Sequence, residues 1–200
     1  MLIYHYTDFH ALYGIISKGE LWMFSTIGMN DPEEMTSYRD YLKERIKDER
    51  EGELEKFRVE EWFEEHDRIL NQPAYVMSFS HLRDDVAQWG RYGNNGCGVN
   101  IVFEYAALQK LAGLQINGML LSDVVYDGSI NEFKLVEQMQ TYLDTQSLPY
   151  AYDTDDSLFR DVVGNACMYK DEHYEIEKEC RLALPAPLSS KDYAYVKMMS

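Results

Sequence analysis

The sequence predicts a single α+β domain spanning residues 1–200, and three observations support this class. Two hundred residues are enough for one domain with a sizeable core but few for two. Apolar residues make up 46% of the chain, which is typical of a globular protein and not of a disordered one. Strand and helix signals alternate irregularly, and this order favours an α+β arrangement over a doubly wound parallel sheet.

The N-terminal segment reads as a strand, a helix and a second strand. Residues 2–6 are apolar and aromatic, and Asp8 is a suitable N-cap for the helix that follows. Gly19 suits the position after the last helical residue, and residues 20–25 form the second strand. The helical stripe predicted to face the core consists of Phe9, Leu12, Tyr13 and Ile16.

Residues 31–70 are predicted to form a charged helical hairpin inserted after the second strand. Asp31-Pro32-Glu33-Glu34 combines an N-cap, a first-turn proline and a capping-box glutamate, and Gly52 marks the expected break. Residues 31–68 hold fifteen Asp or Glu against eight Lys or Arg, which favours a solvated insertion. The side chains expected to supply its core contacts are Tyr38, Tyr41, Leu42, Ile46, Phe57, Trp62 and Phe63.

The rest of the chain continues the mixed pattern. Further strands are predicted at 74–80, 99–104, 120–126 and 177–184. Further helices are predicted after Asp84 or Asp85, over 106–112, from Ser129, and from about 155 to 169. The apolar run of 99–104 predicts a strand that is buried on both faces.

Charge and cysteine content exclude several classes of protein. The formal net charge of -16 argues against a nucleic-acid interface, because such an interface needs clustered Lys and Arg. A small phosphate-bearing ligand is still compatible with it. Cys97, Cys167 and Cys180 have no C-x-x-C spacing, which suits a reducing compartment. With no long apolar run and no leader pattern, the sequence predicts a soluble cytoplasmic protein that does not enter a membrane.

Several familiar catalytic motifs are absent from the sequence. It contains no G-x-G-x-x-G after a strand, no G-x-x-x-x-G-K-[ST], no H-E-x-x-H and no G-x-S-x-G. The five histidines lack metal-ligand spacing, so no metal site is predicted. A Rossmann domain, a P-loop, a zincin and a serine hydrolase are therefore unsupported.

The strongest chemical signal is Glu177-Lys178-Glu179-Cys180-Arg181. On a strand, Glu177, Glu179 and Arg181 leave the same face. One interpretation is an exposed face on which the arginine bridges two carboxylates. The other is a cleft in which the carboxylates stabilise a cationic transition state, such as an oxocarbenium-like sugar centre.

Two earlier strands carry further polar pairs. His5 and Thr7 share one face of the first strand, and Ser78 and Ser80 share a face of the third. A buried histidine bonded to backbone, and strand-end hydroxyls bonded nearby, are the default interpretations. These pairs become candidates for a site only if they meet the glutamates.

In this order, the motifs resemble DUF2971, a bacterial family whose name denotes a domain of unknown function. The resemblance covers most of the chain, although residues 31–70 align least well. Two departures are Cys180, where the family often has tryptophan, and Tyr174, where phenylalanine is usual. The motifs are Tyr4-His5-Tyr6-Thr7, Gly19-x-Leu21-Trp22, Asn30-Asp31-Pro32-x-Glu34, Ser78-Phe79-Ser80, Trp89-x-x-Tyr92-Gly93, Gly98-Val99, Val125-Tyr126, Lys170 and Tyr174-x-x-Glu177-x-Glu179-x-Arg181.

The opening H-x-T strand, helix and G-x-L strand is also similar to the first βα unit of ADP-ribosyltransferases. This resemblance implies a split mixed sheet that binds NAD as a substrate, without a Rossmann fingerprint or a metal. It implies that Glu179 is catalytic with Glu177 beside it. The NAD-binding residues that it implies are His5, which would also be catalytic, Tyr6, Thr7, Ser78, Ser80, Trp89, Tyr92 and Arg181.

The resulting expectation is an enzyme that breaks the nicotinamide–ribose bond of NAD. ADP-ribose would pass to an unknown acceptor, expected to be a protein. The alternative is a catalytically inactive binding module of the same fold in a bacterial defence or toxin-like system, with the acidic hairpin as its interaction surface. A metal-dependent phosphodiesterase or nuclease is disfavoured by the acidic charge and the missing ligand spacing.

Overall fold

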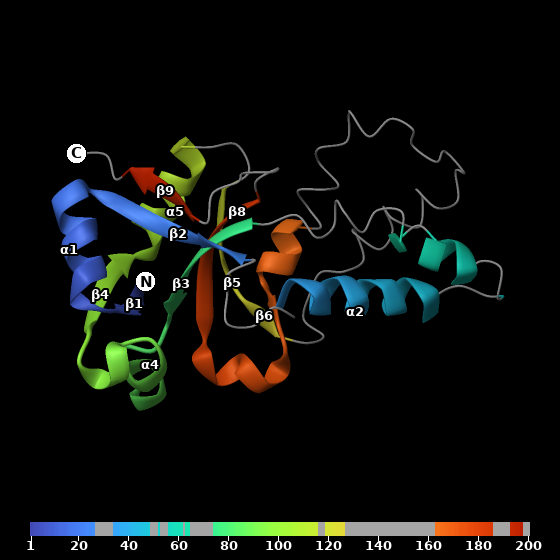
Figure 1. Cartoon of the computed structure of the whole chain (residues 1–200), viewed down its shortest axis with the longest axis horizontal. Helices are drawn as coiled ribbons and strands as arrows, with labels where there is room; N and C mark the ends of the chain where they lie inside the picture. The colour runs from blue at the N-terminus through green and yellow to red at the C-terminus, as the bar shows by residue number, and fades with distance from the viewer. Residues whose placement is uncertain are drawn as a thin grey trace.

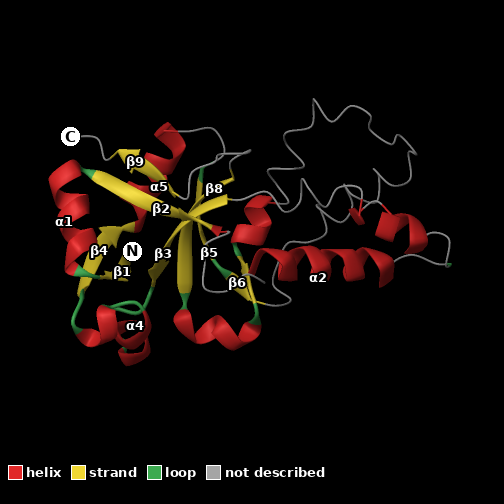
Figure 2. Cartoon of the chain, viewed as in Figure 1, coloured by secondary structure: helices red, strands yellow, loops and turns green. Residues whose placement is uncertain are grey.

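The centre of the molecule is a mostly antiparallel sheet with helices around it (Figures 1 and 2). The computed structural model describes residues 1–26, 34–48, 52, 56–61, 63–64, 74–115, 119–126, 163–185 and 193–197. Within these ranges, the seven sheet strands are β1 (Leu2–Thr7), β2 (Glu20–Ser25), β3 (Ala74–Ser80), β4 (Val99–Glu104), β5 (Leu120–Asp123), β8 (Glu179–Pro185) and β9 (Tyr193–Lys197). β6 (Val125–Tyr126) and β7 (Tyr169–Lys170) form a separate parallel pair. The mixed α+β class expected from the sequence is confirmed.

The strand β3 has a forked edge. On one side it pairs with β8 along its whole length, from Ala74↔Pro185 to Ser80↔Glu179. On the other side, β1 pairs with it at Tyr4↔Ser80, and β2 pairs with it at Phe24↔Val76 and Ser25↔Tyr75. Two strands therefore share this edge and separate between residues 76 and 80, which leaves space for a side chain beside the middle of β3.

The helix α1 (Phe9–Lys18) has the predicted caps but not the predicted inward face. Asp8 accepts a hydrogen bond from the Ala11 N–H at 2.7 Å, and Gly19 ends the helix at φ 64°. Ile15 is buried, whereas Phe9, Tyr13 and Ile16 are exposed. Ile15 joins the core cluster of the sheet, and Leu12 is partly buried.

The charged hairpin begins, within the described residues, with α2 (Glu34–Asp48). Figure 1 shows this helix on the side of the sheet away from α1. Gly52 has a φ of 97°, as expected of a break. The predicted contacts of Tyr38, Leu42, Ile46 and Phe63 are confirmed because these side chains are buried, but Phe57 is exposed on the outer side. Asp31, Trp62 and the end of the predicted hairpin lie outside the described residues.

The later elements differ from expectation at three places. β4 is half-exposed rather than buried on both faces, because it is the end strand of the sheet. The helix α5 (Tyr105–Gln115) continues through Gly113. The predicted strand 120–126 divides into β5 and β6, since the Val124 N–H donates to Glu179 and the Val125 N–H to Met168.

Three short helical segments complete the described elements. They are α4 (Val86–Arg91) and the 3₁₀ helices η2 (Asn94–Gly96) and η3 (Glu172–Glu177). Residues 163–167 are also helical, at the end of the helix predicted for 155–169. The helix predicted from Ser129 lies outside the described residues. None of the helices in the described ranges combines the length and apolar character needed to cross a membrane.

Alternation along the central strands gives the sheet two different faces. One face holds the main core, where Met77 and Phe79 of β3 and Leu182 of β8 pack together with residues of α5. On the other face, Val76 and Ala183 join a smaller apolar cluster with Cys167. Further along that second face, the same two strands carry Ser78, Ser80, Glu179 and Arg181, so polar groups gather beside the fork.

Candidate functional site

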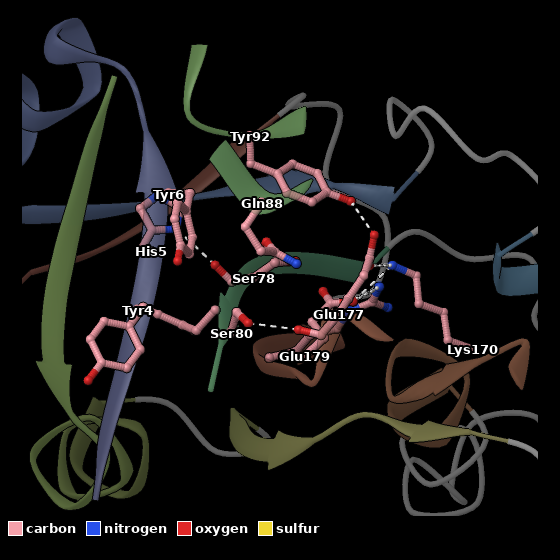
Figure 3. Close-up of a pocket in the computed structure, with 12 residues that line it drawn as sticks. Tyr4, His5, Tyr6, Ser78, Ser80, Gln88, Tyr92, Lys170, Glu177 and Glu179 are labelled. Atoms are coloured by element: carbon pink, nitrogen blue, oxygen red, sulfur yellow. Dashed lines mark hydrogen bonds and ion pairs between the residues drawn. The ribbon is translucent and has the colours of Figure 1, made fainter. Parts of the chain in front are cut away.

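A pocket of about 130 Å³ lies beside the fork of the sheet, open to solvent on one side (Figure 3). Three strands line it, and these strands are far apart in the sequence. β1 contributes Tyr4, His5 and Tyr6, β3 contributes Ser78, Phe79 and Ser80, and β8 contributes Glu179 and Arg181. The remaining lining residues are Gln88, Tyr92, Lys170 and Glu177.

Glu179 and Arg181 form a buried bidentate ion pair. The Arg181 Nε donates to Glu179 Oε1 at 2.7 Å, and Nη2 donates to Oε2 at 3.1 Å. The guanidinium also donates through Nη1 to the Cys167 carbonyl at 2.8 Å. Since Arg181 is 1% exposed and Glu179 is 6% exposed, their charges compensate each other in a site with little water.

Lys170 connects the two glutamates. Its Nζ donates to Glu177 Oε2 at 2.8 Å and to Glu179 Oε2 at 2.9 Å. Figure 3 shows both carboxylates directed toward this ammonium group. Because Lys170 is itself buried, it allows two negative charges to lie close together away from bulk water.

Glu177 reaches the site from a 3₁₀ helix, so the prediction of a strand beginning at residue 177 is wrong. It is the last residue of η3, and Lys178 then adopts a left-handed conformation with φ 44° before β8 begins at Glu179. Its Oε1 accepts from Arg91 Nη1 at 2.7 Å and from the Tyr92 hydroxyl at 3.0 Å. The alternative of an exposed glutamate face is likewise wrong, because Glu177 is 3% exposed.

The local charges determine the protonation states of two site residues. Burial by itself would raise the pKa of Glu179, but Arg181, Lys170 and a hydrogen bond from Ser78 outweigh it and lower the pKa to about 2. Burial, followed by the charge of Glu177, raises the pKa of Tyr92 to about 12. At neutral pH the site therefore presents an ionised Glu179 and a protonated Tyr92 hydroxyl.

His5 occupies the fork of the sheet. Its Nδ1 lies 2.8 Å from the Ser78 carbonyl oxygen, and its ring lies 5.7 Å from that of Phe79. A carbonyl only accepts, so Nδ1 carries the proton and Nε2 is the acceptor of a neutral ring. Burial lowers the pKa of His5 despite the Ser78 hydrogen bond, which favours that neutral form. The backbone bond matches the default interpretation, and His5 also lines the pocket.

The acid sensitivity of the fold provides the first prediction. The pKa of Glu179 is depressed from 4.5 to about 2 in the folded protein, so its stabilising contribution is complete above about pH 4.5 and is lost as the pH falls toward 2. Chemical denaturation at pH 7 and pH 3 should show a smaller acid-induced loss of unfolding free energy in Glu179→Gln than in the wild type, by about 2 kcal/mol. Equal losses would contradict this assignment.

The pocket contains most of the predicted site residues but not all of them. His5, Tyr6, Ser78, Ser80, Tyr92, Glu177, Glu179 and Arg181 line it, whereas Thr7 and Trp89 do not. Trp89 packs against the lining residue Tyr6, since the two rings meet edge-on with their centroids 5.0 Å apart. The Trp89 indole N–H donates to Asp84 at 2.7 Å. Thr7 lies at the end of β1, where it pairs with Val99.

Four lining residues were not predicted as site residues: Tyr4, Phe79, Gln88 and Lys170. Tyr4, Phe79 and Lys170 occur within the motifs that carry the family resemblance, so a signal was present for them. Gln88 precedes the Trp89 motif and has no such signal. Among the described residues, no group of three or more His, Cys, Asp or Glu side chains is arranged to hold a metal ion.

One family model matches part of the chain. Residues 88–182 match the model of the family described as "Protein of unknown function (DUF2971)". The match supports the resemblance to that family and covers β4, both glutamates, and parts of α4 and β8. The search of curated proteins found no match. The search of solved structures also found none.

Proposed function

We propose that this chain is an ADP-ribosyltransferase-like enzyme that breaks the nicotinamide–ribose bond of NAD and transfers ADP-ribose to an acceptor, expected to be a protein. The observation that carries the proposal is the meeting of His5, Ser80 and Glu179 in one pocket, although they come from three distant strands. The resemblance of the opening motif implies this combination of strands. The forked edge of β3 also supports the split sheet expected of that class.

The size of the pocket limits which part of NAD enters it. A cavity of 150 Å³ accommodates benzene in another protein, so about 130 Å³ suits one six-membered ring. We assign the pocket to the nicotinamide end of NAD, with the rest of the dinucleotide at the open side. Tyr6 and Tyr92 then lie beside the ring.

Charge stabilisation is the proposed catalytic contribution of Glu179. When the bond between the ribose C1′ and the nicotinamide nitrogen breaks, both electrons leave with the nitrogen, and neutral nicotinamide is released. The ribose is left with positive charge shared between C1′ and the ring oxygen. The ionised carboxylate of Glu179, with its low pKa, stabilises this charge. An acceptor O–H or N–H group then forms a bond to C1′ and releases its proton to water.

A second candidate, a non-catalytic ligand-binding module, is favoured by a specific observation. Each glutamate is already engaged by cations, Glu179 by Arg181 and Lys170, and Glu177 by Lys170 and Arg91. A buried network of this kind also occurs where charges serve structure alone. The two candidates differ in whether NAD is consumed.

The deciding experiment measures nicotinamide released from NAD, with cell lysate added as a source of acceptors. Glu179→Gln should reduce the rate to about 1% of the wild-type value, the usual effect of removing one group that stabilises transition-state charge. Glu175→Gln is the matched control, since that carboxylate is exposed and pairs with Lys178; it should keep the wild-type rate. No release by the wild type, or equal release by wild type and Glu179→Gln, would contradict the enzyme.

A second variant is needed because Glu179→Gln removes the charged partner of the buried Arg181 and can therefore impair folding. Ser78→Ala removes a hydroxyl that helps to lower the pKa of Glu179 and leaves every charge in place. If Glu179→Gln does not fold, Ser78→Ala decides the question: it should slow release roughly fivefold while keeping its unfolding temperature close to that of the wild type. An unchanged rate in this folded variant would count against Glu179.

A further inference from the structure

Gln88 is a buried polar side chain in the wall of the pocket (Figure 3). It is 5% exposed. Its backbone is fully engaged in α4: the N–H donates to Asp85 Oδ1 at 3.0 Å, and the carbonyl accepts from the Tyr92 and Gly93 N–H groups. The side-chain amide, in contrast, has no hydrogen-bond partner among the described residues. The sequence and the helix therefore place an amide at the pocket with no partner in the part of the chain that the structure describes.

The amide atoms of Gln88 keep contact with solvent through the pocket, because neither is among the buried side-chain atoms without a partner in the described residues. A ligand that enters the pocket would displace this water, and it must then pair with the amide or leave it unsatisfied. The polar groups of Tyr92 and His5, which line the same pocket, are already hydrogen-bonded within the protein. The Tyr92 hydroxyl donates to Glu177, and His5 bonds the Ser78 carbonyl. A ligand in the pocket would therefore find the amide of Gln88 available.

We propose that Gln88 determines ligand specificity by pairing its side-chain amide with the amide edge of a planar ring. Its Oε1 accepts from an N–H of the ligand, while its Nε2 donates to an adjacent acceptor. Two sources present this edge: the carboxamide of nicotinamide, and the amino group with the neighbouring ring nitrogen of adenine. The first source rests on the function proposed above, and the second does not require NAD cleavage.

Ring selectivity is the first test, measured by titration calorimetry with the full chain. We expect the wild type to bind nicotinamide at least tenfold more tightly than 3-acetylpyridine, which keeps the carbonyl but lacks the N–H₂ donor. Gln88→Met preserves the length of the side chain and removes both polar atoms, so the two compounds should then bind equally. Val86→Ala, on the exposed side of the same helix, should keep the wild-type preference.

Thermal stability without ligand separates a binding role from a structural one. If the amide has no protein partner, Gln88→Met should leave the unfolding temperature within about 2 °C of the wild-type value, because no protein hydrogen bond is lost. A structural hydrogen bond would make the same substitution lower it. Val86→Ala should leave the unfolding temperature nearly unchanged.

The outcomes also separate this inference from the proposed function. Selective nicotinamide binding that depends on Gln88, without NAD cleavage, would support the inference and contradict the enzyme. Gln88-dependent binding of adenine in preference to nicotinamide would support the inference and contradict the assignment of the pocket to nicotinamide. Failure of the wild type to bind either ring at millimolar concentration, or a selectivity that survives in Gln88→Met, would overturn the inference.

Discussion

Replacing Arg181 with methionine should destabilise the fold by about 3–5 kcal/mol, the usual cost of removing one partner of a buried ion pair. The guanidinium is 1% exposed and donates twice to Glu179 and once to the Cys167 carbonyl. Without it, Glu179 keeps a single buried cation, Lys170, which it shares with Glu177. The cost arises mainly from this incompletely compensated charge.

Denaturant unfolding of three variants, each compared with the wild type, tests this expectation. The double variant Glu179→Met Arg181→Met should be more stable than Arg181→Met alone, because it leaves no unpaired carboxylate at residue 179. Lys178→Met breaks an exposed pair with Glu175 and should change stability by less than about 0.5 kcal/mol. A cost for Arg181→Met close to that of Lys178→Met would mean that the buried network contributes little.

Gly98→Ala should cost about 3 kcal/mol or more, because a backbone contact leaves no space for a methyl group. A Cβ at residue 98 would lie 2.2 Å from the Thr7 carbonyl oxygen and 2.7 Å from that of Gly93. Neither oxygen moves easily: β1 is paired at Thr7↔Val99, and the Gly93 carbonyl accepts from the Gly98 N–H at 2.8 Å. The substitution would therefore push β1 and β4 apart next to the pocket.

Gly113→Ala is the matched control for this prediction. Gly113 lies in α5, and beyond the helix's own backbone no atom of the described residues comes within 4 Å of a Cβ placed there. Alanine suits a helix better than glycine, so this variant should gain about 0.5–1 kcal/mol. Thermal or denaturant unfolding measures both changes, and a loss in Gly98→Ala no greater than about 1 kcal/mol would contradict the close contact.

Local signals predicted the elements of the fold that depend on local chemistry. Asp8 and Gly19 marked both ends of α1, because caps are short-range contacts. The start of β8 was misplaced, because Glu177, Lys178 and Glu179 continue a strand pattern although Lys178 turns the chain. Two-sided burial of β4 was likewise wrong, since position within a sheet depends on partners that are distant in sequence.

Long-range pairing limited what could be predicted of the site. The glutamates, serines and His5 were identified from same-face spacing and from resemblance, and the structure brings them together. Lys170, the cation that joins both glutamates, comes from β7, and no spacing rule relates it to β8. Gln88 was missed because an unpaired amide is recognised only after its neighbours are known.

The two parts of the pocket wall come from different stretches of chain. Lys170, Glu177, Glu179 and Arg181 fall within the matched region 88–182, whereas the lining residues of β1 and β3 precede it. A relative that matches only over the later stretch need not share the side chains that β1 and β3 present to a ligand. Ligand preference can thus depend on both stretches, since Gln88 and Tyr92 lie in the matched region as well.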